Sequence, residues 1–337
     1  MKTEEIRYWL KLQSTEFVGH KTFNVIYHML KEEGKEISYF FEMDKEKIES
    51  MLEHKRIRHG KEIANSLSKE KGNFQKIDQI ISRLSEKKID IITLEDKKYP
   101  TKLKETLTDS TPPILYAFGN VSLLETSSVA IAGKREATTK ATEISQQVAS
   151  SLADNGFNIV SGYAKGIDTA AHLGALKQGG TTTIVLPFGI LNFSWKKEFE
   201  NFRERNSSIL IISEFFPTIK WQVPLAMQRN NTIVGLSDVV FAAEFSEGGG
   251  TRDTMRKALR SGKQVFVPDT VANRHLLGKE EKDVFFVQLQ YSEKGKCVLD
   301  VSAILNAASK TKTPKYNERY EQPILLSDDE NSYRKTK

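Results

Sequence analysis

Three glycine-containing loops combine backbone freedom with polar or cationic side chains, a combination that suits the binding of phosphate groups. They are Gly133-Lys134-Arg135, the segment from Ser161 and Gly162 through Lys165 and Gly166, and Gly248-Gly249-Gly250-Thr251. Glycines let backbone N–H groups approach an anion, and a helix N-terminus adds about half a positive charge. Tight turns also use glycine, so one such loop would be weak evidence. Three loops, two with cations, favour an anion-binding site.

A second group of residues could contact a nucleic-acid strand. Arg229 could bind a phosphate through two N–H groups, and Asn230 could cap a helix or hydrogen-bond a base edge. Lys196 and Lys197 follow Trp195, and an aromatic beside cations suits a strand whose bases stack while its phosphates pair. Further aromatic candidates for stacking are Tyr163 and Trp221. The alternative is a solvated helix face around Arg229 and aromatics that lie in the core.

Two titratable residues follow the second loop, and we predict structural roles for both. Asp168 precedes Thr169-Ala170-Ala171, where a carboxylate suits a helix N-cap that accepts a backbone N–H. A catalytic carboxylate at that place would repel a bound anion. His172 lies one turn further among alanines, so we expect it to be packed and hydrogen-bonded rather than catalytic.

The elements that must position these loops alternate between short apolar runs and helical patterns from Ser127 onward. The predicted strands are 128–132, 157–160, 183–186, 209–212, 239–243 and 264–267. Several are continuous β-branched runs, which is typical of strands buried on both faces. The sequence therefore predicts an α/β fold with a doubly wound, mostly parallel sheet of extended Rossmann-like type. Ligands of such sheets bind beyond the carboxyl ends of the strands.

The chain divides into three predicted parts. Residues 1–88 show apolar residues at helical spacing and predict an N-terminal helical domain, either a small bundle or a hairpin-type DNA-contacting module with Lys21, Lys31 and Lys35 near phosphates. Residues 89–305 form the Rossmann-like domain: 89–125 are a connector with extended segments, and 285–287 and 298–299 extend the sheet. Residues 306–337 are polar and lysine-rich, which predicts a disordered tail.

Composition limits the classes of function. The 337 residues include 50 Lys and Arg against 44 Asp and Glu, and this net charge of +6 favours a polyanionic partner without requiring one. The single cysteine, Cys297, excludes an intramolecular disulfide and a cysteine-based zinc site. We see neither a signal peptide nor about 18 continuous apolar residues. We therefore expect a cytoplasmic protein with no membrane contact, and predict no metal, cofactor or catalytic residue.

Taken together, these residues resemble the DprA/Smf family of bacterial DNA-processing proteins, from about Tyr99 to Pro268. The most specific element is Ser161-Gly162-x-Ala164-x-Gly166-Ile167-Asp168-x-x-Ala171-His172. Supporting elements are Pro113-Ile114-Leu115-Tyr116 with Gly119, Gly133-x-Arg135, Ser213-Glu214, Arg229-Asn230 with Ile233 and Gly235-Leu236, and Glu244.

The resemblance implies a homodimeric protein that binds and protects single-stranded DNA and helps to load a RecA-type recombinase during natural transformation. It also implies that Arg135, the loop from Ser161 to Gly166, and Arg229-Asn230 contact DNA. This chain departs from the family pattern at Lys134, where serine is usual, and at Asn231, where a second arginine is usual. It departs again at the triple glycine 248–250.

Two other functions remain open from the sequence. The loop Gly248-Gly249-Gly250-Thr251 is similar to the glycine-rich loop of LOG-type nucleotide phosphoribohydrolases, in which case Glu244 or Asp253 would act on a ribose. The divergent loops are also compatible with a DprA-like sensor of foreign single strands in phage defence.

Overall fold

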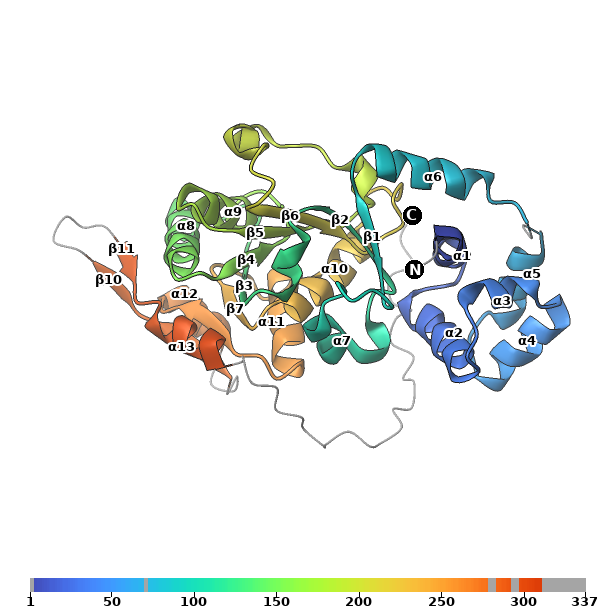
Figure 1. Ribbon diagram of the computed structural model, residues 1–337. Coiled ribbons are helices and arrows are strands. Elements are labelled where there is room, and N and C mark those ends of the chain that lie inside the picture. The colour runs from blue at the N-terminus through green and yellow to red at the C-terminus, as the bar shows by residue number, and fades with distance from the viewer. Residues whose placement is uncertain (1–2, 70–71, 278–282, 292–296, 311–337) are drawn as a thin grey trace.

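The computed structural model describes residues 3–69, 72–277, 283–291 and 297–310. Figure 1 shows a central sheet with helices around it and a group of helices, coloured blue to cyan, at one end. In these described ranges, no helix has both the length and the apolar character needed to cross a bilayer.

The first part of the chain is helical, which confirms the prediction for this region. Its helices are α1 (Thr3–Ser14), α2 (His20–Glu32), α3 (Ile37–Glu42), α4 (Lys45–His54), α5 (Gly60–Lys69) and α6 (Gln75–Glu86). They bury apolar residues at the predicted spacing, such as Phe23, Ile26 and Leu30 on α2. This apolar cluster continues through Tyr116 to the sheet, so the helices pack onto the rest of the protein.

Polar contacts also join the helices to the sheet. Tyr116 donates a hydrogen bond to Oε1 of Gln13 (2.6 Å), and Nε2 of Gln13 donates to the carbonyl of Glu214 (3.0 Å). Two of the lysines expected near phosphates have acidic partners instead, since Lys31 pairs with Glu95 and Lys35 with Glu33. These two ion pairs argue against a phosphate site at those positions.

The central sheet has nine strands within the described residues. They are β1 (Asp90–Thr93), β2 (Ile114–Gly119), β3 (Ser128–Ala132), β4 (Asn158–Ser161), β5 (Thr182–Val185), β6 (Ile209–Ser213), β7 (Val239–Ala242), β8 (Val265–Pro268) and β9 (Val284–Val287). Their order is β1-β2-β6-β5-β4-β3-β7-β8-β9, and only β2 pairs antiparallel with both of its neighbours. The sheet is therefore mixed but mostly parallel, as predicted.

Helices cover both faces of this sheet. The longer ones are α7 (Thr101–Leu107), α8 (Thr139–Asp154), α9 (Ile167–Lys177), α10 (Val223–Leu236), α11 (Gly250–Arg260), α12 (Val271–Leu277) and α13 (Ser302–Lys310). Short 3-10 turns are η1 (Thr108–Ser110), η2 (Val121–Glu125), η3 (Ile190–Asn192) and η4 (Lys197–Phe202). Alternate residues of β3 point to opposite faces: Val129 and Ile131 pack with α8 and α9, and Ala130 packs with α10 and α11.

The order of the strands reverses at β3. From β3 the chain adds β4, β5 and β6 on one side, and then crosses to add β7, β8 and β9 on the other side. The loops after β3 and β7 therefore lead away from each other, which opens a crevice at the carboxyl ends of these two strands. Two of the three glycine loops follow these strands, and the third follows β4.

Three details differ from the sequence-based expectations. The connector supplies β1 and β2, which extend the main sheet. Val298-Leu299 does not extend it, because β11 (Cys297–Leu299) pairs with β10 (Leu289–Tyr291) in a separate two-stranded sheet. Helix α13 continues past residue 306 to Lys310, and the rest of the predicted tail lies outside the described residues.

His172 fixes α9 to the sheet. Its ring is fully buried, and Nδ1 lies 2.6 Å from the hydroxyl of Thr182 on β5. That hydroxyl donates to the carbonyl of Ile159, so it accepts from His172, and the proton resides on Nδ1. Nε2 has no partner in the described structure. Burial, aided by the positive charges of Lys196 and Arg229, lowers the pKa of His172 to about 3.

This burial predicts a pH-dependent stability. The unfolded chain binds a proton at His172 near pH 6.5 and the folded chain only near pH 3, so stability is lost as the pH falls through this window. Between pH 7 and pH 5 the native chain should lose about 2 kcal/mol more of its free energy of unfolding than the His172→Asn variant loses. Urea unfolding of both proteins at each pH measures the difference. If the free energy of unfolding fell equally with pH in both proteins, His172 would not be held neutral in the folded chain.

Candidate functional site

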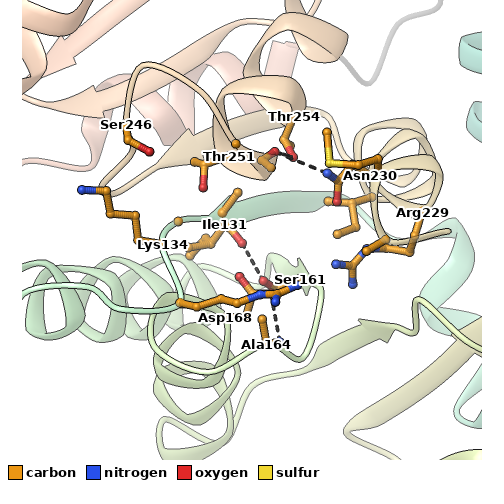
Figure 2. Close-up of a pocket in the computed structure, with 18 of the residues that line it drawn as sticks. Ile131, Lys134, Ser161, Ala164, Asp168, Arg229, Asn230, Ser246, Thr251 and Thr254 are labelled. Atoms are coloured by element: carbon orange, nitrogen blue, oxygen red, sulfur yellow. Dashed lines mark hydrogen bonds between the residues drawn. The ribbon is translucent and has the colours of Figure 1, made fainter. Parts of the chain in front are cut away.

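A pocket of about 660 Å³ lies in the crevice where the strand order reverses (Figure 2). Ten of the fifteen residues predicted to contact nucleic acid or phosphate line it: Gly133, Lys134, Arg135, Ser161, Arg229, Asn230, Gly248, Gly249, Gly250 and Thr251. The other five, which are Gly162, Lys165, Gly166, Lys196 and Lys197, lie outside the lining, whereas Asp168 and Trp221 belong to it. The three loops therefore converge on one cavity, whose size suits a small molecule or one unit of a polymer.

The loop after β3 places one exposed cation at the mouth of the pocket. A side chain at Gly133 would collide with Ile167, so this glycine allows α9 to approach β3 closely. Lys134 is half-buried and its Nζ lies 3.4 Å from Oε1 of Glu244. Arg135 is exposed, and its guanidinium lies 5.6 Å from the ring centroid of Trp221. Arg135 is thus the residue of this loop that is available to an anion.

Glu244 occupies the N-terminus of the helix that follows this loop. Its Oε2 accepts hydrogen bonds from the backbone N–H of Thr138 (2.9 Å) and from the Thr138 hydroxyl (2.8 Å), and Thr138 is the N-cap of α8. Partial burial opposes ionisation, but these bonds and the ammonium of Lys134 outweigh it and lower the pKa of Glu244. Glu244 is therefore a carboxylate that already fills the anion site of α8.

The loop after β4 is held by internal hydrogen bonds. The hydroxyl of Ser161 donates to the carbonyl of Ile131 (2.6 Å) and is fully buried. Gly166, at φ +73°, is the N-cap of α9, and any side chain there would collide with the backbone of Lys134 and Arg135. Lys165 is exposed and follows Ala164, which lines the pocket.

Asp168 has a structural role, but not as the N-cap that the sequence predicts. It lies inside the first turn of α9, and Oδ2 accepts the N–H of Ala164 from the preceding loop (3.1 Å; Figure 2). Burial raises its pKa, and the positive charge of Arg229 opposes that rise. Asp168 thus closes the loop back onto the helix and places an acidic group at its N-terminus.

Arg229 is buried beneath the loops rather than presented on the surface. Its Nη1 donates to the carbonyls of Gly162 (2.7 Å) and Val185 (2.5 Å), and its Nε has no partner in the described structure. A side chain at Gly162 would overlap this guanidinium. Burial lowers the pKa of Arg229, although Asp168 and Glu214 favour its charged form. Through these two hydrogen bonds, Arg229 holds the ends of β4 and β5 together.

The loop after β7 leaves a helix N-terminus open to the pocket. Gly249, at φ +95°, is the N-cap of α11, and within the described residues no side chain caps this helix. Asp253 in its first turn is engaged by Lys257 (2.8 Å) and by Nδ2 of Asn230 (3.3 Å). Asn230 also donates to the carbonyl of Gly250 (3.3 Å; Figure 2). The first residues of α11 thus line the cavity, together with the exposed glycines that precede them.

The aromatic and cationic residues around Trp195 form a packed cluster instead of an open surface. Nζ of Lys196 donates to the carbonyls of Tyr163 (2.6 Å) and Ala164 (3.1 Å), and to the hydroxyl of Thr169 (3.1 Å). Tyr163 is buried, so it offers no face to a base. Trp195 is half-buried against Phe193 and Phe199. In this cluster, Lys197 is the exposed cation.

Sequence reasoning missed one wall of the pocket. Val223, Ala226 and Met227 on the first turns of α10 line it together with Asn230. Their spacing of three and four residues marks one helix face, a signal that could have been found by extending the helical pattern around Arg229 back to Val223. Trp221, considered only as a possible stacking residue, lies at the mouth and is 45% exposed.

The geometry determines what the site can bind. Each of the three helix N-termini at this edge has a carboxylate: Glu244 binds the N-cap of α8, Asp168 lies in the first turn of α9, and Asp253 lies in the first turn of α11. At α11 this carboxylate is paired with Lys257, and no side chain caps the helix within the described residues. With Arg135 and the exposed ring of Trp221 at the mouth, the pocket offers an anion site next to a surface on which a planar group can stack.

Comparisons with known proteins agree with this arrangement. The DNA processing protein DprA of Streptococcus pneumoniae is 34% identical over 180 residues, which cover 52% of this chain and 62% of that protein. The DNA processing protein DprA of Bacillus subtilis is 28% identical over 197 residues, covering 57% and 65%. The matched segments thus span less than two thirds of these relatives.

Solved structures show the same fold. The X-ray structure of S. pneumoniae DprA matches with a TM-score of 0.65 at 24% identity, and covers 85% of this chain and 94% of that one. DprA from Helicobacter pylori, whose structure is described for its single-stranded DNA binding mode, matches with a TM-score of 0.51 at 25% identity, covering 66% and 95%.

The family model for DNA recombination-mediator protein A matches residues 90–282. This range includes the sheet from β1 to β8 and all three loops of the pocket. Because the match spans more than half of the 337 residues, the chain belongs to the DNA recombination-mediator protein A family.

Proposed function

We propose that the pocket and its rim bind single-stranded DNA. The observation that carries this proposal is the N-terminus of α11, which lies in one cavity with Arg135 and Trp221. No side chain of the described residues caps this helix, and the Asp253 carboxylate in its first turn is paired with Lys257. A phosphate at α11 would meet backbone N–H groups and the positive end of the helix dipole. A base next to it would meet the exposed ring of Trp221.

The site suits a strand better than a rigid duplex. The pocket is a recess, and a nucleotide that enters it must leave the stack of its neighbours, which costs less in a single strand. Lys165 is exposed and follows Ala164, which lines the pocket, so it adds a cation outside the volume that one nucleotide fills. Family membership and the described DNA-binding mode of the H. pylori relative support the same ligand.

The biological role follows from this ligand and from the family. The protein protects incoming single strands, acts as a homodimer and passes the strand to a RecA-type recombinase during DNA uptake. The support for this role is membership of the recombination-mediator family and similarity to the DprA proteins of S. pneumoniae and B. subtilis.

The arrangement of acids argues against nucleotide hydrolysis. Glu244 is engaged by Thr138 and Lys134, and Asp253 by Lys257 and Asn230. The bonds to Glu244 lower its pKa, which disfavours the protonated form that a general acid needs. These contacts support the proposal that the protein acts by binding rather than by nucleotide hydrolysis.

Arg135→Ala should weaken binding to a fluorescent oligonucleotide about equally for all base sequences, because Arg135 offers charge and not base recognition. For the native chain, about four to six phosphate contacts give a slope of log K against log salt of about −3 to −4. The variant should flatten this slope by about 0.7. Anisotropy titrations at several salt concentrations measure both. Unchanged affinity in the variant would remove Arg135 from the site.

Charge reversal separates the pocket rim from the rest of the positive surface. Lys165→Glu should weaken strand binding more than Lys310→Glu at the end of α13, although both variants change the net charge equally. The same titration compares them, with thermal unfolding as the control for folding. A larger effect of Lys310→Glu would place the binding surface elsewhere.

Incubation of the protein with nucleoside monophosphates should release neither free base nor ribose phosphate, because the acids nearest the loops are already engaged. Chromatography of the mixture after prolonged incubation tests this. Release that is lost in Glu244→Gln would make the protein an enzyme and contradict the proposal.

A further inference from the structure

The turn between α4 and α5 carries a dense group of exposed basic residues that the pocket does not use. Six of the eight residues from 54 to 61 are Lys, Arg or His, and all six are exposed: His54, Lys55, Arg56, Arg58, His59 and Lys61. We call this group the basic turn. Ile57, between them, is partly buried and packs against the apolar cluster of the domain.

The backbone holds these side chains in a defined arrangement. The N–H of Arg56 donates to the carbonyl of Glu53 (2.8 Å), and that of Ile57 donates to Leu52 (2.9 Å), which closes the end of α4. A side chain at Gly60 would lie 3.0 Å from Cβ of Leu52, so the two helices approach closely there. The basic turn is therefore a tight junction and not a loose loop.

Acidic neighbours neutralise only part of this charge. Glu62 lies 3.7 Å from His59, and Glu49 lies 3.5 Å from Lys61. In the described part of the chain no ion pair forms at Lys55 or Arg56. At least these two cations are available to an external anion.

An exposed aromatic ring lies against the basic turn. Phe17, in the loop between α1 and α2, is 39% exposed and stacks on the ring of His59, with centroids 4.4 Å apart and planes 21° apart. Cations beside an exposed, stacked aromatic pair match the chemistry of a nucleic acid, in which phosphates alternate with planar bases. A polyanion without bases, such as a sulfated polysaccharide, would use the charges but not the rings.

We propose that the basic turn, with Phe17, is a second nucleic-acid-binding surface that contacts the phosphodiester backbone independently of the pocket. In Figure 1, α4 and α5 lie at the edge of the molecule, whereas α10 and α11, which border the pocket, lie near the centre. A nucleic acid that occupies both surfaces must be long enough to reach from one to the other. This surface does not depend on the single-strand site proposed above.

The test compares Lys55→Glu/Arg56→Glu with Lys76→Glu/Lys87→Glu in the full chain. The control lysines are exposed on or next to α6 in the same part of the protein, and both variants change the net charge by the same amount. With a long strand, Lys55→Glu/Arg56→Glu should bind about tenfold more weakly at low salt, and its slope of log K against log salt should flatten by about 1.5. The control should stay near the native values. Single-stranded and duplex DNA are titrated in parallel to identify the preferred form.

Two further measurements keep the outcome clear. A strand short enough to fill only the pocket should respond to Arg135→Ala but not to Lys55→Glu/Arg56→Glu, so the two sites can fail separately. In the native chain, ultraviolet cross-linking to a strand with 5-bromouracil should label the peptide that holds Phe17 or residues 54–61. The proposal is overturned if Lys55→Glu/Arg56→Glu binds single-stranded and duplex DNA as tightly as Lys76→Glu/Lys87→Glu does, and cross-linking labels neither the peptide with Phe17 nor residues 54–61. It is also overturned if heparin binds this surface and nucleic acid does not.

Discussion

The buried guanidinium of Arg229 is the interaction on which the edge of the sheet depends. A charge removed from water must be matched by hydrogen bonds, and Arg229 finds them at the carbonyls that end β4 and β5, at Gly162 and Val185. Glycine at residue 162 leaves room for this guanidinium, which any side chain there would displace from its two carbonyls. The same cation opposes the rise in the pKa of Asp168, which ties the loop after β4 to α9. The position of the loops thus follows from one buried charge.

Once these loops are fixed, the remaining question is which helix can receive an external anion. Each helix N-terminus at the edge attracts negative charge, and the protein supplies it at α8 through Glu244, at α9 through Asp168 and at α11 through Asp253. At α11 this charge is paired with Lys257, and the helix begins with glycines and has no side-chain cap in the described structure. The proposed anion site therefore lies in the crevice between β3 and β7, where Arg135 and Trp221 add charge and a stacking surface.

Much of the fold could be predicted from the sequence, because short β-branched runs separated by helical periodicity allow few architectures. The pairing of β11 could not, since an apolar run does not specify its partner. The convergence of the three loops could also be predicted, because the loops that follow parallel strands meet at the carboxyl edge of the sheet. The internal roles of Lys196 and Arg229 were not predictable, because spacing does not show whether a cation meets protein carbonyls or solvent. Burial and hydrogen-bond partners decide this, and they depend on packing between distant segments.

The most direct test of the central claim is hydrogen–deuterium exchange of the full chain with and without a saturating single-stranded oligonucleotide. If a phosphate occupies the open N-terminus of α11, the amides from Gly249 to Arg252 should exchange more slowly in the complex. The amides around Arg135 should be protected with them. Unchanged exchange at α11 with saturating DNA, and protection only elsewhere, would contradict the account.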